Sequence, residues 1–195
     1  MKTNNTPTPI LAPAPAKPAY HKIDKQDAEW LRSALGKNPA KPQLHFVSVS
    51  DHKVYGHCAA VTDGYRLHVL EIDQNIPNGY YTIEKRTGSL IPASLNGQNY
   101  PDIWQIIPDK YDDVTDTLPP TILREDAPAV YEIGGSLFSK FYVNQSIPTD
   151  CAFRFKTRKP IEQTYTTKLF HQAGLIEIKN PKIKRTQLAV IMPTN

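Results

Sequence analysis

The sequence has 195 residues, of which 39% are hydrophobic, and a formal net charge of +4. A chain of this length can bury a core without staples, and its two cysteines are too few for a disulfide framework or a zinc pattern. No apolar run reaches the roughly 18 residues of a membrane span, and the N-terminal run ILAPAPA is too short and too rich in proline for a signal peptide. Composition therefore predicts a soluble cytoplasmic protein and argues against membrane and disulfide-stapled secreted classes.

Residues 1–19, MKTNNTPTPILAPAPAKPA, consist mostly of Thr, Asn, Pro and Ala. Such a segment cannot bury enough apolar surface to offset the entropy lost on ordering. We expect a disordered arm here and a folded domain over residues 20–195.

The first predicted element is a helix over residues 24–36, DKQDAEWLRSALG. Asp24 is the N-cap candidate and Gly36 the C-cap candidate. Helical spacing places four apolar side chains on one face, which we expect to face the core. These are Trp30, Leu31, Ala34 and Leu35.

Three β-rich runs follow the helix, at residues 43–50, 53–61 and 65–72. The turn-like stretches SDHK and TDG separate them, and Asp63-Gly64 is a strong hairpin signal. A helix followed by an antiparallel meander is the simplest interpretation.

Residues 73–127 contain many prolines and aspartates, with only YYTIEK and IWQII resembling ordered structure. Residues 101–126 hold seven acidic and two basic side chains, a net charge of −5. We expect this segment to be an insertion or a connector.

The opening pattern then returns. The run AVYEI predicts a strand, residues 134–146 a short helix with Ser136 as N-cap, and CAFRFK, QTYTTKLF, LIEIK and QLAVIMP further strands. Strand, helix and several strands thus occur twice, which predicts an α+β fold of duplicated β-α-β-β-β units with antiparallel sheets. The half-units are residues 20–72 and 128–195.

Residues 151–195 carry nine basic and two acidic side chains, a net charge of +7. This basic third either attracts a phosphate backbone or is simply a solvated surface, and the sequence leaves both interpretations open.

No motif for catalysis or metal binding is present. The six histidines, at positions 21, 45, 52, 57, 68 and 171, show no metal-ligand spacing, and no nucleophile elbow, P-loop or Rossmann glycine pattern occurs. Asp63 and Asp102 are better explained as backbone caps than as paired catalytic carboxylates, and Gly134-Gly135 as a turn rather than an anion site. Cys58 and Cys151 are expected to act as small buried hydrophobic residues. We expect no enzyme activity, no cofactor and no metal.

Three pieces of the chain together resemble the bacterial DNA polymerase III β subunit, the replicative sliding clamp. AAVTDGYRLHV resembles that family's Ala-Thr-Asp-Gly-His-Arg-Leu-Ala signature, with Val61 and Tyr65 replacing alanine and histidine. YPDIWQIIP is similar to the Phe-Pro-Asp-Tyr-Arg-Arg-Val-Leu-Pro segment, and the closing LAVIMPTN to Tyr-Val-Val-Met-Pro-Met-Arg-Leu. The three pieces occur in the family's order.

The resemblance implies a hydrophobic groove that takes short clamp-binding peptides of polymerases and other replication factors. Carried over by position, the predicted groove consists of Thr62, Gly64, Tyr65, Arg66, Leu67, Pro101, Ile106, Val190 and Met192. A homo-oligomeric clamp also encircles double-stranded DNA without reading sequence, which needs basic side chains on the helices. The DNA-facing candidates are Lys25, Arg32, Lys37 and Lys140.

The chain also departs from the family. Clamp chains carry three domains and close a ring as a dimer, whereas this chain has length for one complete domain or two abbreviated ones. The arginine pair is missing from IWQII, and the end lacks Met-Arg-Leu. The alternative is therefore a non-ring interaction module or decoy, of phage or mobile-element type, that keeps the peptide groove. An enzyme on an α+β scaffold is the last-ranked hypothesis.

Overall fold

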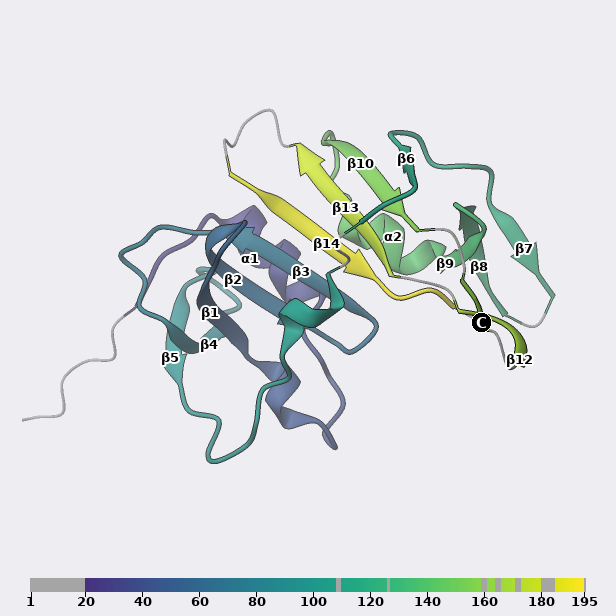
Figure 1. Cartoon of the computed structure of the whole chain (residues 1–195). Helices are drawn as coiled ribbons and strands as arrows, with labels where there is room; N and C mark the ends of the chain where they lie inside the picture. The colour runs from purple at the N-terminus through teal and green to yellow at the C-terminus, as the bar shows by residue number, and fades with distance from the viewer. Residues whose placement is uncertain are drawn as a thin grey trace, which may run out of the picture.

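The computed structural model describes residues 20–107, 110–125, 127–158, 161–163, 166–170, 173–179 and 185–194. The predicted arm at residues 1–19 lies outside them. The described chain is an α+β fold in which an antiparallel sheet carries α1 (Lys25–Ser33) and α2 (Lys140–Ser146) on one face (Figure 1). The predicted fold class is confirmed. Within the described residues, no helix is both long and apolar enough to cross a membrane.

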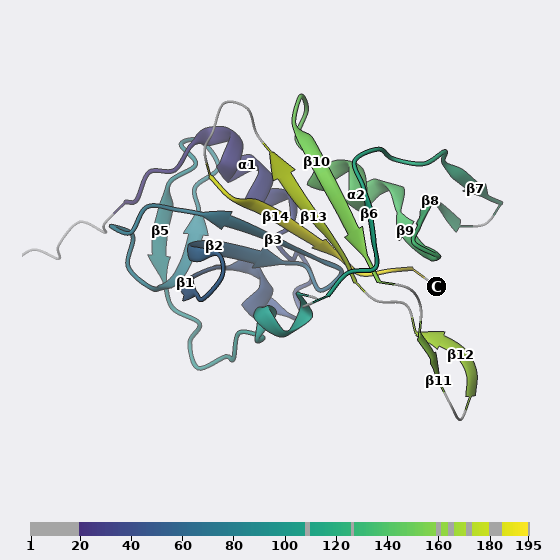
Figure 2. The same cartoon turned by 45° about the horizontal axis from the view of Figure 1, so that its top comes forward.

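Nine strands form the main sheet, in the spatial order β5-β4-β1-β2-β3-β14-β13-β10-β6. Their bounds are Val47–His52 (β1), Gly56–Thr62 (β2), Arg66–Glu71 (β3), Gly79–Ile83 (β4), Leu90–Ala93 (β5), Asp113–Thr115 (β6), Ala152–Thr157 (β10), Gly174–Lys179 (β13) and Gln187–Ile191 (β14). A second sheet contains β7 (Ile122–Arg124), β8 (Ala127–Ile133) and β9 (Ser136–Ser139). The hairpin of β11 (Ile161–Gln163) and β12 (Thr166–Phe170) projects from the body (Figure 2).

The centre of the main sheet shows the duplication. Strands β3 and β14 pair there, from Arg66 opposite Ile191 to Leu70 opposite Gln187. Outward from this seam lie β2 and β1 on one side and β13 and β10 on the other, and each set is preceded in the chain by one helix. The order α1-β1-β2-β3 therefore recurs in the main sheet as α2-β10-β13-β14, with the β11–β12 hairpin inserted after β10. Among the described residues no strand precedes α1, so the leading strand expected for the first half is absent there.

Helix α1 begins where the sequence predicts and ends earlier. The Asp24 carboxylate accepts a hydrogen bond from the Gln26 amide at 2.7 Å, which confirms the N-cap. The helix ends at Ser33, before Gly36. Gly36 donates its backbone N–H to Leu44 O, and a Cβ on Gly36 would lie 2.6 Å from the Leu44 Cβ. This glycine is needed for a close approach rather than for the cap.

The helix predicted over residues 134–146 is half wrong. Gly134 and Gly135 have φ of 57° and 75°, the geometry of a tight hairpin turn between β8 and β9. The helix starts only at Lys140, with Ser139 as N-cap in place of Ser136. Ser136 instead lies buried in β9.

Residues 73–127 hold more structure than the sequence indicates. Strands β4 and β5 extend one side of the main sheet, and β6 forms its other edge. The short 3₁₀ helix η2 (Ile103–Ile106) lies across the sheet face opposite α1 and α2. That the segment is an insertion or a connector stays a prediction.

The main sheet has an apolar cluster on each face. On the helix face, Trp30 and Leu31 of α1 pack with Leu70, Phe138 and Ile191. The opposite cluster is smaller and packs under η2; its members include Leu67, Val69, Leu188, Val190 and Ile103. Neighbouring residues of one strand therefore belong to different cores.

Candidate functional site

The Thr-Asp-Gly turn is held by its own side chains. The Asp63 carboxylate accepts from the backbone amides of Tyr65 and Arg66 at 2.9 and 3.0 Å. The Thr62 hydroxyl donates to Arg66 O at 2.7 Å and accepts from the Gly64 amide. Gly64 has a φ of 94°, where a side chain would be strained. The capping role expected for Asp63 is confirmed, and four hydrogen bonds hold the turn.

Arg66 is almost fully buried at the junction of both halves of the chain. Its Nε donates to Asp63 at 3.1 Å, Nη1 to the Gln145 side chain of α2 at 2.7 Å, and Nη2 to the Ser33 carbonyl at the end of α1. Its guanidinium carbon lies 4.9 Å from the Tyr142 ring centroid. Burial lowers the pKa of Arg66, and the Asp63 charge opposes that effect. Arg66 thus ties the turn to both helices.

Strand alternation divides the predicted groove between the two faces of the sheet. Thr62, Leu67 and Val190 share the face covered by η2, since Leu67 pairs with both of the others. Leu67 and Val190 are each 0% exposed and pack in the same cluster as Ile106. Arg66 points to the helix face. The predicted groove is therefore not one continuous row of side chains.

Two of its members are exposed and adjacent. Tyr65 is 62% exposed and Met192 is 37% exposed, and the Met192 amide donates to Tyr65 O at 2.8 Å. The Tyr65 ring stacks on Tyr142 with centroids 6.0 Å apart. Pro101 is exposed two residues before η2. The chain end thus runs beside the turn.

A cavity of about 350 Å³ opens between the end of α1, the turn and α2. Tyr65 and Arg66 line it together with Phe141, Tyr142 and Gln145 of α2. Ser33, Leu35, Lys37, Asn38 and Asp63 complete the lining. Sequence reasoning missed these α2 residues because none of the three clamp-like pieces, from which the groove was predicted, includes residues 140–146.

Leu44 is a second residue that the sequence did not single out. It is buried, and its Cδ1 lies 4.0 Å from where a Cβ on Gly64 would be. The Leu44 side chain therefore lies beside Gly64 in the Thr-Asp-Gly turn. No local sequence signal pairs position 44 with position 64.

Lys25 and Arg32 lie at the two ends of α1 and Lys140 at the start of α2, whereas Lys37 lies four residues beyond the end of α1 and is not on a helix. Lys25 and Lys37 are exposed and Lys140 is half-buried. The Arg32 guanidinium donates to the Lys85 carbonyl at 3.1 Å, so one of its N–H groups is already used within the chain. DNA contact by these four residues stays a prediction.

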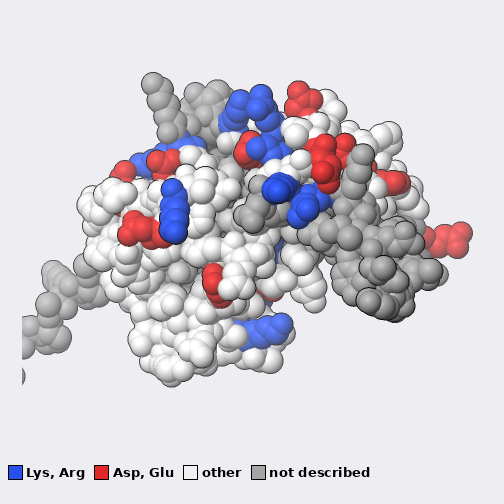
Figure 3. Space-filling model, in the orientation of Figure 1, with Lys and Arg blue, Asp and Glu red and all other residues white. Residues whose placement is uncertain are grey.

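Two basic side chains of the C-terminal third form ion pairs. Lys156 pairs with Glu177, and Arg185 lies 3.2 Å from Asp73. On the face shown in Figure 3, blue and red side chains alternate on a mostly white surface. This face has no continuous basic stripe among the residues described.

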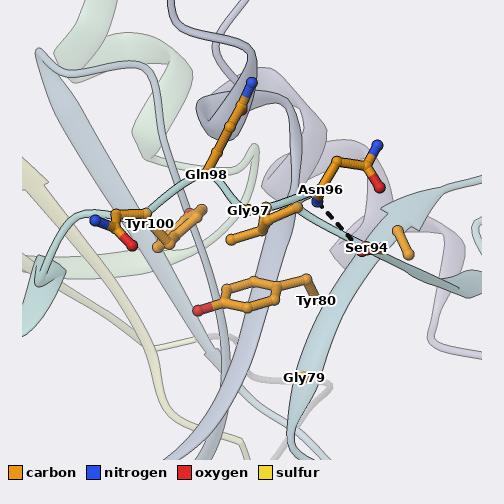
Figure 4. A pocket seen from close by; sticks show the side chains of 10 residues that line it. Gly79, Tyr80, Ser94, Asn96, Gly97, Gln98 and Tyr100 are labelled. Carbon is orange, nitrogen blue, oxygen red and sulfur yellow. Dashed lines mark hydrogen bonds between the residues drawn. The ribbon is translucent and has the colours of Figure 1, made fainter.

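A larger hollow, of about 550 Å³, lies under the loop from Ser94 to Tyr100. Its rings, Tyr80 and Tyr100, have centroids 5.5 Å apart. The side chains of Asn96 and Gln98 point away from the Tyr80 ring (Figure 4). Because these polar groups do not converge, the hollow lacks the features of a ligand site.

The remaining chemistry candidates have structural explanations. The Asp102 carboxylate caps η2 through the Trp104 amide at 3.3 Å, as expected. Burial raises the pKa of Cys58 to about 12, so this thiol is unreactive, and Cys151 is half-buried. Within the part of the chain that the structure describes, no group of three His, Cys, Asp or Glu could hold a metal ion.

No protein-family model matches this chain, and no curated protein matches it by sequence. By structure it is similar to the DNA polymerase III subunit β of Borrelia burgdorferi, with a TM-score of 0.55, 12% identity, and coverage of 88% of this chain and 60% of that one. The β subunit from Streptococcus pyogenes matches with a TM-score of 0.56 and 11% identity, covering 96% of this chain and 68% of that one. The β subunit from Pseudomonas aeruginosa matches with a TM-score of 0.55 and 12% identity, covering 96% of this chain and 69% of that one. All three matches have probability 1.00. The chain has the fold of a bacterial sliding clamp.

The sliding-clamp resemblance read from the sequence is confirmed at the level of the fold. The chain spans 60–69% of the length of these three clamp chains. At such low identity, the likeness establishes the shared fold and leaves the activity to be argued from this chain's own residues.

Proposed function

We propose that this protein is a sliding-clamp-like accessory factor of DNA replication, without catalytic activity, that binds replication or repair proteins through a peptide. The supporting observation is the clamp fold together with the three signature pieces, which converge on the Thr-Asp-Gly turn: Met192 bonds to Tyr65, and Ile106 packs in one cluster with Leu67 and Val190.

The exposed side chains beside the turn carry the peptide contact in this proposal. Tyr65 and Met192 offer apolar surface, and the cavity beside Tyr65 has room for a large side chain. Interfaces draw most of their energy from a few aromatic and apolar anchors in such pockets. Leu67 and Val190 support the site from within the core, because neither is accessible.

A DNA-encircling oligomer is the second part of the proposal. Lys25, Lys37 and Lys140 lie on or beside the helices, the elements that would face phosphates in a ring. Such contacts would be independent of base sequence and sensitive to salt.

The competing candidate is a monomeric or dimeric module that binds the same peptides without encircling DNA. A ring of this fold would need several copies of the chain, whereas the module would act alone or in pairs. Light scattering of the purified protein, with and without nicked circular DNA, separates the two.

Peptide binding is tested by fluorescence anisotropy with a labelled clamp-binding peptide of a bacterial replicative polymerase. We expect the full chain to bind and the double variant Tyr65→Ser/Met192→Ser to bind at least about tenfold more weakly, as for the loss of a hot spot. Val54→Ser is the control, because Val54 is also an exposed apolar residue but lies in the β1–β2 turn, at the other end of β2. No binding by the wild type, or equal loss in the control, would refute the proposal.

A further inference from the structure

Strand β5 is one end of the nine-stranded sheet. No described strand lies beyond it. An open sheet edge presents unpaired N–H and C=O groups and is a template for another chain. Whether β5 is open therefore bears on how copies of this protein can associate.

The segment before α1 covers the first position of that edge. The His21 amide donates to Leu90 O at 3.0 Å, and the Leu90 amide donates to His21 O at 2.8 Å. These two bonds form an antiparallel bridge outside the sheet. Both outward-facing backbone groups of Leu90 are thereby used.

Pro92 occupies the next outward-facing position of β5. In an antiparallel strand, backbone groups point alternately to one neighbour and to the other, so Leu90 and Pro92 face outward while Ile91 and Ala93 face β4. Pro92 has no N–H to offer. The four-residue strand thus has no free outward donor.

The segment before α1 that covers the β5 edge also packs on the core. The His21 ring meets the Tyr81 ring edge-on at 5.8 Å, Ile23 is buried, and Asp24 begins α1. Because α1 packs on the sheet, the bridge at His21 is fixed by the fold and not by the arm that precedes it.

We infer that the β5 edge is closed to strand addition, so this chain does not build a head-to-tail ring by extending the nine-stranded sheet. A head-to-tail interface joins two different surfaces, and sheet extension would need both edges. At the other end, β6 exposes Val114 and has no described strand beyond it. Within the nine-stranded sheet, one open edge allows at most a two-fold pair by strand pairing. Resting on the proposed function, a ring of these copies would have to close through surfaces other than the β5 edge.

The test is sedimentation of the full chain over a range of concentrations. In the double variant His21→Pro/Pro92→Thr, the Leu90 carbonyl loses the residue 21 N–H that bonds to it, and position 92 gains an outward-facing backbone N–H. We expect this variant to gain mass with concentration relative to the wild type, while Pro120→Thr, an exposed loop proline, matches the wild type. A double variant with the wild-type mass would overturn the inference, provided thermal melting shows that it folds.

Amide exchange on the wild type keeps the inference testable if the variant does not fold. The Leu90 amide should exchange slowly and equally at all protein concentrations, because its partner is His21 of the same chain. Protection that appears only at high concentration would mean pairing with another copy and would overturn the inference. Neither measurement contains peptide or DNA, so its failure is distinct from failure of the proposed function.

Discussion

His68 is a fully buried histidine between the two helices. One ring nitrogen lies 2.9 Å from the Trp30 carbonyl and the other 2.9 Å from the Ser146 hydroxyl, and the ring stacks on Trp30. The Nδ1–H donates to the carbonyl, so the neutral ring accepts from Ser146. Burial lowers the pKa of His68 from 6.5 to about 3.

That shift makes stability depend on pH. The unfolded chain takes up a proton near pH 6.5 and the folded chain does not, so the contribution is complete above pH 6.5 and is lost as pH falls toward 3. The free energy of unfolding should fall by up to about 1.4 kcal/mol per pH unit from this group. Urea unfolding between these pH values measures the slope. His68→Gln should flatten it, and an unchanged slope would contradict this assignment.

Asp27 is a buried acid that is only half satisfied. Its Oδ1 accepts from the Gln187 side-chain amide at 2.7 Å, whereas Oδ2 and the Gln187 Oε1 have no hydrogen-bond partner among the described residues. Burial, followed by the nearby Asp24 charge, raises the pKa of Asp27 above 3.8. The folded state therefore holds the Asp27 carboxyl proton more tightly than the unfolded state does. The free energy of unfolding falls as pH rises from 3.8 through the raised pKa of Asp27.

Asp27→Asn should remove the penalty. The asparagine oxygen still accepts from the Gln187 amide, and its NH2 group is a donor that the unpaired Gln187 Oε1 can accept. We therefore expect the free energy of unfolding to rise by on the order of 1 kcal/mol at about pH 7, and by less toward about pH 4. Thermal melting at both pH values measures it. Asp24→Asn is the control, since asparagine caps a helix as well as aspartate does. Destabilisation by Asp27→Asn at neutral pH would contradict the account.

Residue roles were predictable where partners are close in sequence. The caps at Asp24, Asp63 and Asp102 depend on residues two or three positions away, and all three were predicted as capping residues. The partners of Arg66 were not, because Ser33 and Gln145 are 33 and 79 positions away. Such contacts follow from the packing of the two halves, which no local pattern encodes.

At the level of elements, Gly36 fixes how the end of α1 meets the η1 helix (Pro42–His45). Gly36→Ala would bring its Cβ within 2.6 Å of the Leu44 Cβ, so the backbone must shift. We expect a loss of about 1–3 kcal/mol in the free energy of unfolding, as for an overpacked core.

Gly56→Ala is the matched comparison. Gly56 has a φ of 72° but open space around it, so alanine there should cost only about 1–2 kcal/mol of backbone strain. Chemical unfolding of both variants gives the difference. In addition, Gly36→Ala should weaken peptide binding through Leu44 and the turn, whereas Gly56→Ala should not. The reverse order in binding would contradict the role given to Leu44.

The elements themselves were largely readable. Alternation and turn signals gave the meander of β1, β2 and β3 because each hairpin is local. The β8–β9 hairpin was missed because SLFS fits both an amphipathic helix start and a strand, and only the paired positive φ of Gly134 and Gly135 decides. Strand β5 was missed because LIPA is short and contains a proline, which only an edge strand tolerates.

At the level of the whole molecule, the proposal of DNA binding depends on the lysines on and beside the helices. Replacing Lys25, Lys37 and Lys140 together by glutamine should weaken DNA binding and reduce the slope of log affinity against log salt by about 0.9 for each lysine that contacts phosphate. Filter binding or anisotropy with duplex DNA at several salt concentrations measures this. The control is the triple change Lys53→Gln, Lys110→Gln and Lys179→Gln, all exposed and off the helices. Equal slopes for the two triple variants would contradict a DNA-facing helix surface.

The most direct test of the central claim is amide chemical-shift mapping of the full chain with the polymerase clamp-binding peptide. A peptide site at the Thr-Asp-Gly turn predicts that the largest shifts fall at Tyr65, Ile106 and Met192, and that the Ser94 to Tyr100 loop stays unchanged. Shifts centred on that loop, or no shifts at saturating peptide, would contradict the claim that this clamp fold has kept a peptide site at the turn.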